Sequence, residues 1–214
     1  MYYHFKGVNL RPHHKDSIDY LVGRLSTDPS ILAIIISGSV AKGVAREDSD
    51  IDCYLVVSDD LFEEKKQRDQ LFYFERDGCD YPGGYYDGKI IPYRFLEAAV
   101  VRGSEPTRAS FDKAFVAFSR ISGMDDLIAK IPVYPEHNRE RNLQDFFAQV
   151  ELYGGYFADR AIEQGNIYLL IHAIGQVALF SGRLVLAYNR VLFPCHKSMT
   201  SVLRTLPHIP ERYF

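Results

Sequence analysis

Residues 38–52 read GSVAKGVAREDSDID, and this stretch decides the fold. The run before it, residues 31–36, is short, apolar and β-branched, which is typical of a strand buried on both faces. A second strand is expected over residues 50–57, where Asp50 and Asp52 stand two positions apart. Because alternate side chains of a strand point to the same face, both carboxylates share one face, and the apolar residues between and after them point into the core.

The spacing of Asp50 and Asp52 indicates a metal site. Two carboxylates on one face repel each other unless a cation lies between them. Oxygen ligands suit Mg²⁺, which keeps several waters and takes further oxygens from substrate phosphates. A pair of such ions, about 3.5–4 Å apart, can hold the attacking and the leaving oxygen of an in-line phosphoryl displacement. Both aspartates are therefore predicted metal ligands and catalytic residues.

The corner before the aspartates, Gly38-Ser39, is a candidate phosphate site. Gly38 lets the backbone turn tightly and approach a ligand closely. Ser39 offers a hydroxyl and a backbone N–H at an expected helix start, which is a favourable place for an anion. Gly43 keeps the following loop thin, and Lys42 and Arg46 either add positive charge there or are simply solvated.

This stretch resembles the signature of the DNA polymerase β-type nucleotidyltransferase superfamily: Gly-Ser, a short spacer with Gly, then Ser-Asp-x-Asp in a strand. The run from Ser49 to Asp52 is in register with that pattern. The resemblance implies a nucleoside triphosphate donor, expected to be ATP, together with Mg²⁺. It also implies that Gly38, Ser39, Lys42 and Ser49 bind the nucleotide. The alternative is a Ser/Asp-rich turn between two structural strands.

The remaining elements of residues 1–135 fit an α/β (α+β) domain with a small mixed sheet flanked by helices. Helical spacing predicts a helix over residues 14–25. Ser58 is expected to cap a second helix that runs through about Phe74. A strand is expected over residues 114–118. This part of the chain is the predicted nucleotidyltransferase domain.

The superfamily that the motif resembles usually places a third carboxylate on a later strand, where it completes the metal site or acts as general base for the acceptor hydroxyl. A third strand is expected over residues 85–95, with a turn at Asp87-Gly88, and the part from Gly88 onward holds no acid. Pro92 stands about where an acid would be sought. Asp87 is the candidate catalytic acid, although Asp-Gly is also a common turn. Asp112 is a second possibility, in a stretch that resembles a helix start.

Residues 136–214 are predicted to form a helical domain. Apolar residues keep a 3/4 spacing in two long helices joined at Gly165-Asn166, and a last helix is expected from near Ser198. Together with Tyr134-Pro135, this region resembles the C-terminal helical region of antibiotic (aminoglycoside or lincosamide) adenylyltransferase-like members. That resemblance implies a region that closes over the nucleotide and forms part of the acceptor pocket. Lys197 either contacts the triphosphate or is a solvated lysine.

Composition limits the alternatives. The formal net charge of −3 excludes a globally basic nucleic-acid binder. Three cysteines without a C-x-x-C pair indicate neither a disulfide framework nor a zinc site, and reduced thiols are expected in a cytoplasmic protein. The N-terminal residues lack the layout of a signal peptide, and no apolar run is expected to approach the roughly 18 residues that span a membrane.

Three functions remain open. The first is metal-dependent transfer of AMP from ATP to a hydroxyl of an unidentified small molecule, with release of pyrophosphate. The second is AMP transfer to a protein partner, as in antitoxin-type members. The third is a catalytically weak nucleotide-binding or regulatory module, which the missing strand acid favours.

Overall fold

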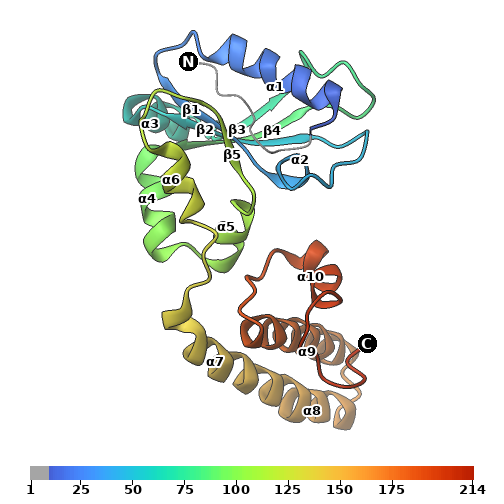
Figure 1. The fold of residues 1–214 in the computed structure, drawn as a ribbon. Helices are drawn as coiled ribbons and strands as arrows, with labels where there is room; N and C mark the ends of the chain where they lie inside the picture. Colours follow the sequence, from blue (N-terminus) through green and yellow to red (C-terminus); the bar gives the residue numbers. More distant parts are fainter. Residues whose placement is uncertain (1–9) are drawn as a thin grey trace. The chain divides into compact units, whose positions relative to one another are not determined.

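A computed structural model describes residues 10–214, and the chain divides into two compact units (Figure 1). One extends to Val133 and the other comprises Tyr134–Phe214. The N-terminal residues whose sequence argues against a signal peptide lie outside the described part of the chain. Each unit is taken by itself below.

A mixed five-stranded sheet forms the centre of the first unit. Its spatial order is β3-β4-β2-β1-β5. The parallel pair is β2 with β4, whereas β1 is antiparallel to β2 and β5, and β3 is antiparallel to β4. The predicted mixed sheet is therefore confirmed. Its strands are β1 (Ile31–Ile36), β2 (Ile51–Val57), β3 (Phe72–Glu75), β4 (Tyr86–Pro92) and β5 (Phe115–Ser119).

Helices cover both faces of the sheet, as Figure 1 shows for α1 on one side and α4 and α6 on the other. The first core contains Ile51, Cys53 and Leu55 from β2 and residues of α1, which confirms the expected direction of these side chains. The second core contains Tyr54 and Val56 together with residues of α4 and α6. The helices of this unit are α1 (Pro12–Leu25), α2 (Gly38–Ala41), α3 (Asp59–Gln67), α4 (Tyr93–Arg102), α5 (Glu105–Ser110) and α6 (Met124–Ala129).

The expected helix from Ser58 to Phe74 is wrong in its second half. Ser58 does cap α3, where its hydroxyl accepts a hydrogen bond from the Leu61 N–H at 3.4 Å. The helix ends at Gln67. Asp69 has a positive φ of 56°, which is incompatible with a right-handed α-helix. Phe72–Glu75 then forms β3, whose side chains alternate between exposed and half-buried.

The expected turn at Asp87-Gly88 is also wrong. Each residue of β4 from Tyr86 to Pro92 pairs with a residue of β2 in an unbroken parallel ladder, so Asp87 lies inside the strand. Pro92 ends that strand opposite Val57. Asp112 follows α5 rather than beginning a helix.

The second unit is helical, as predicted. Its long antiparallel pair turns at Gly165, which has a φ of +62°, and the Asn166 side chain caps the second helix by accepting from Leu169 N–H at 3.0 Å. A π-helical segment at Leu152–Phe157 joins α7 to α8. The elements are a 3-10 turn (Glu136–Asn138), α7 (Arg139–Glu151), α8 (Ala158–Glu163), α9 (Ile167–Tyr188) and α10 (His196–Leu203).

Among the described residues, α9 alone is long and apolar enough to cross a membrane, with a mean hydropathy of 1.7 over an 18-residue window. This finding differs from the expectation that no segment reaches spanning length, because polar residues such as Ser181 and Arg183 interrupt the run without lowering its mean below that of a span. A single such helix is weak evidence for a membrane, since core helices of soluble proteins pass the same test.

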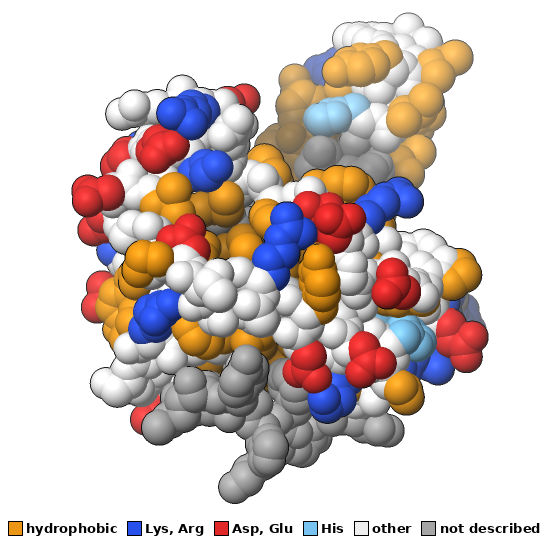
Figure 2. Space-filling model, turned by 90° about the horizontal axis from the view of Figure 1, so that it is seen from above, with side chains coloured by type: hydrophobic (Ala, Val, Ile, Leu, Met, Phe, Trp, Pro, Cys, Tyr) orange, Lys and Arg blue, Asp and Glu red, His pale blue; other side chains and the backbone are white. Residues whose placement is uncertain are grey.

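Charges of both signs are interspersed on the surface. Figure 2 shows Asp and Glu side chains beside Lys and Arg side chains over the described residues of the face seen from above, with no continuous basic area there. This distribution agrees with the nearly equal numbers of basic and acidic residues in the sequence, 25 and 28.

Candidate active site

Three carboxylates from two neighbouring strands converge at one edge of the first unit. Asp50 directly precedes β2, Asp52 lies within it, and Asp87 lies within β4. The parallel register pairs Asp52 with Asp87. One oxygen of each carboxylate lies within 4.8 Å of the others. The strand acid that the sequence lacks from Gly88 onward is thus supplied one residue earlier, by Asp87.

The donor set fits Mg²⁺. All three side chains offer carboxylate oxygens, the ligands that this ion prefers. Asp50 and Asp52 are half-buried and Asp87 is exposed, so the cluster is partly enclosed by protein and is open to solvent at Asp87. Three like charges this close repel one another unless a cation lies among them.

Gly38 packs so closely against Asp52 that a side chain at position 38 would collide with the Asp52 carboxylate. A Cβ at this position would lie 1.8 Å from Asp52 Oδ2, and the residue has a φ of +66°. The neighbouring Ser37 N–H donates to the Asp52 carbonyl oxygen at 2.9 Å. The Gly38-Ser39 corner is therefore held directly beside the acids, and the tight turn expected at Gly38 is present.

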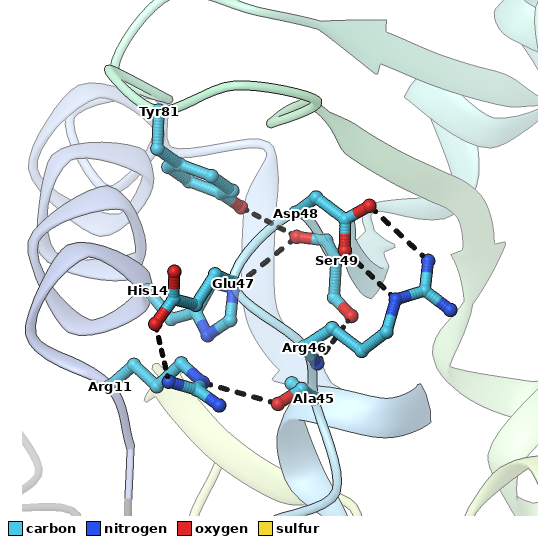
Figure 3. A network of polar contacts seen from close by, with 8 residues as sticks. All are labelled: Arg11, His14, Ala45, Arg46, Glu47, Asp48, Ser49 and Tyr81. Atoms are coloured by element: carbon cyan, nitrogen blue, oxygen red, sulfur yellow. Dashed lines mark hydrogen bonds and ion pairs between the residues drawn. The ribbon is translucent and has the colours of Figure 1, made fainter.

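The loop that leads to Asp50 is anchored at the Ser49 carbonyl. The Tyr81 hydroxyl donates to this oxygen at 2.9 Å, and His14 Nε2 donates to it at 3.3 Å (Figure 3). The Ser49 hydroxyl accepts from the Arg46 N–H at 2.9 Å. Ser49 therefore uses both oxygens within the protein, and the structure gives it the role of fixing the approach to Asp50.

Two further contacts fix the same loop from α1. Arg11 Nε donates to the Ala45 carbonyl oxygen at 3.2 Å, and its Nη1 reaches Glu47 at 3.5 Å (Figure 3). His14 is 1% exposed, and burial lowers its pKa. The bond to the Ser49 carbonyl requires a proton on Nε2, which the neutral imidazole supplies in its Nε2–H tautomer.

Tyr85 contacts the first aspartate. The Asp50 carboxylate, which can accept a hydrogen bond from the Tyr85 hydroxyl, raises the pKa of Tyr85. Its ring packs against Phe74, with ring centroids 5.1 Å apart. Nothing in the sequence near Tyr85 indicates that β3 supplies Phe74 as its neighbour.

A cavity of about 140 Å³ adjoins the acids. Lys42 lines it, and Lys42 Nζ lies 3.3 Å from Asp112 Oδ2, so the loop lysine predicted at the nucleotide already has an internal counter-ion. Lys197 belongs to the other unit, where it is exposed in the first turn of α10. The cavity is lined by Ser37, Gly38, Lys42, Asp52, Cys53, Tyr54, Asp87, Lys89, Ala109 and Ser110.

Two solved structures show similarity over much of the chain. A nucleotidyltransferase-like protein from Exiguobacterium sibiricum 255-15 matches with a TM-score of 0.50 at 12% identity, over 90% of this chain and 62% of that protein. This chain therefore spans less than two thirds of that protein's length, and the likeness concerns the fold alone. A toxin-antitoxin structure with AMP-PNP matches with a TM-score of 0.32 at 16% identity, over 61% of this chain and 93% of that one, which is too low to support an argument. Comparison with curated proteins gave no match.

The family comparison falls on the site itself. Residues 18–88 match the model of the nucleotidyltransferase domain family. The matched range begins in α1 and ends in β4, so it contains Gly38, Asp50, Asp52 and Asp87. This match agrees with the resemblance found in the sequence: over residues 18–88, about a third of the chain, the protein is similar to the nucleotidyltransferase domain family.

Proposed function

We propose that this protein transfers AMP from ATP to a hydroxyl group of a small acceptor molecule and releases pyrophosphate. The observation that carries the proposal is the convergence of three carboxylates within 4.8 Å beside a glycine that leaves room only for backbone. A triphosphate needs divalent cations and close backbone approach; the three carboxylates could hold the cations, and the corner at Gly38 offers backbone N–H groups beside them.

Asp50, Asp52 and Asp87 would hold Mg²⁺, which when bound neutralises phosphate charge and polarises the phosphoryl group. The sheet order β4-β2-β1 separates Asp87 from the Gly38-Ser39 corner by one strand. We assign the β- and γ-phosphates to the corner, and the α-phosphate with the attacking acceptor oxygen to the side of Asp87. These are opposite sides of Asp52, as an in-line displacement requires.

In the proposed reaction the acceptor oxygen forms a bond to the α-phosphorus while the bond from that phosphorus to the pyrophosphate oxygen breaks. The acceptor hydroxyl gives its proton to the exposed Asp87 carboxylate, and pyrophosphate leaves with its electron pair. The protein contributes mainly position and electrostatic stabilisation. Gly38, Ser39 and Lys42 bind the phosphates in this proposal. Ser49 acts through the loop that leads to Asp50.

A purely regulatory module is less well supported than it was from the sequence. The argument for such a module was that the expected third strand holds no acid from Gly88 onward. The observed strand β4 includes Asp87, which pairs with Asp52. The helical unit favours a small-molecule acceptor by resemblance. The three cysteines are free, which fits a reaction in the cytoplasm.

The test is transfer of label from ATP carrying a radioactive α-phosphate, with a panel of hydroxylated small molecules as acceptors. Asp52→Asn should lower pyrophosphate release by about a hundredfold or more, because it removes a charge from the metal site. Asp126→Asn, an exposed change in the first turn of α6, is the matched control and should keep full activity. Equal activity of Asp52→Asn and wild type would refute the proposal. Label found on a protein would instead establish a protein acceptor.

A further inference from the structure

Lys89 lies in the same row of side chains as the acids. The parallel register of β2 and β4 pairs Asp52 with Asp87 and, two residues further along, Tyr54 with Lys89. Because alternate residues share a face, all four side chains lie on one face of the sheet. All four also line the cavity beside the acids. Lys89 is exposed, so its side chain is available to a ligand there.

The ammonium group of Lys89 differs from that of the other lysine in the cavity. Lys42 is neutralised by Asp112 at 3.3 Å. Lys89 makes no ion pair with any residue in the described part of the chain, and its Nζ lies 5.9 Å from the centre of the Tyr54 ring. A positive charge over an aromatic face is attracted by the ring while it keeps all three donors for another partner.

The ring beneath Lys89 is itself fixed. The Tyr54 hydroxyl donates to Ser110 Oγ at 2.8 Å, and the Ser110 hydroxyl donates in turn to the Thr107 carbonyl oxygen at 2.7 Å. The Tyr54 ring stacks on Phe111 with centroids 4.5 Å apart and planes 10° apart. Tyr54 therefore presents a well-anchored aromatic face beside the ammonium group of Lys89.

The charges at the site favour a cation in this place. Even with two divalent cations bound, three carboxylates and a triphosphate leave the site negative. Lysine is a common ligand of phosphate oxygens and acts as a point charge. We propose that Lys89 is a phosphate-binding residue of this site, whose ammonium group, placed by the Tyr54 ring, donates to phosphate oxygens of the bound nucleoside triphosphate. This inference rests on the proposed function.

The proposal predicts two effects of opposite sign when the charge is removed. Lys89→Ala in the full chain should weaken binding of a non-hydrolysable ATP analogue with Mn²⁺ by about tenfold or more, since a charge-assisted hydrogen bond is lost. The same variant should bind Mn²⁺ alone more tightly, because a nearby positive charge no longer repels the metal. Paramagnetic resonance of Mn²⁺ measures the second affinity, and calorimetric titration measures the first.

Two further variants complete the experiment. Lys89→Arg keeps the charge and should stay within about threefold of wild type in both measurements. Lys130→Ala, at the exposed end of α6, should change neither. A loss of both affinities in Lys89→Ala would indicate structural damage and overturn the role of Lys89, as would an unchanged nucleotide affinity. A wild-type protein that binds no nucleotide would overturn the proposed function as well.

Discussion

The two units of this chain enclose their apolar side chains to different degrees. The unit up to Val133 has a buried core on each face of its sheet. The unit Tyr134–Phe214 has one small core at the C-terminal half of α9, formed by Val185, Leu186, Phe193 and Leu203. The first half of α9 pairs with α7 and α8 but leaves large side chains in solvent. Ile167, Tyr168, Ile171 and Ile174 are between 59% and 79% exposed.

This difference shows where a site can be held rigidly. Each proposed ligand in the first unit lies on a strand between two cores or on a loop with several hydrogen bonds. Lys197 lies on a short helix beside the small core, and its role depends on resemblance alone. Changes in one unit should therefore leave the properties of the other intact, and the following variants test that separation.

The largest effect is expected in the small core. Leu186 is fully buried, so Leu186→Ala should destabilise the helical unit by about 2–5 kcal/mol through lost contacts and a residual cavity. Chemical denaturation followed by circular dichroism measures this change. Ile171→Ala on the same helix, at a side chain that is 67% exposed, should stay within about 0.5 kcal/mol of wild type. A Leu186→Ala protein that also loses Mn²⁺ affinity would show that the units do not behave separately.

Gly38→Ala should have the next largest effect, within the sheet unit. The new Cβ would meet the Asp52 carboxylate, and the positive φ adds backbone strain, for a destabilisation of about 1–3 kcal/mol. Gly43→Ala is the matched control, because Gly43 also has a positive φ, of 70°, but no atom lies within 4 Å of its added Cβ.

Both glycine variants should therefore lose stability, and only Gly38→Ala should lose Mn²⁺ affinity, because only there is a carboxylate displaced. Thermal unfolding and Mn²⁺ titration measure the two properties. Equal Mn²⁺ affinities in the two variants would contradict the inference that a side chain at position 38 displaces the Asp52 carboxylate.

The smallest effect is expected at the loop anchor. Tyr81→Phe removes one of the two side-chain donors to the Ser49 carbonyl oxygen and should cost about 0.5–1.5 kcal/mol of unfolding free energy. Tyr20→Phe serves as control because the Tyr20 side chain is 45% exposed. Urea denaturation of both variants compares them directly. Indistinguishable midpoints would mean that the anchor contributes nothing to stability.

The sequence predicted the parts of the site that depend on local spacing. Gly38, Asp50 and Asp52 are set by a turn and by the two-residue period of one strand, and both are readable along the chain. Asp87 reaches the site only through parallel pairing with β2, a contact distant in sequence. The local signal at Asp87-Gly88 predicts a turn, and the ladder with β2 overrides it.

Other residues could not be assigned from the sequence for the same reason. Tyr85 and Lys89 acquire their neighbours from β2 and β3, so neither carries a recognisable motif of its own. The helical pattern places Phe72 and Phe74 at the end of a helix, although a run of three aromatic residues is equally typical of a strand. The backbone reversal at Asp69, which has no Gly or Pro to mark it, separates these two interpretations.

Parallel pairing also determines how the chain can vary in length. The crossover from β2 to β4 passes through α3 and β3, and its length does not set the distance between Asp52 and Asp87. Insertions or deletions between these elements should leave the Asp52–Asp87 pair unchanged as long as the two strands keep their register. A slip of a single residue, by contrast, would turn Asp87 to the opposite face and put Gly88 in its place.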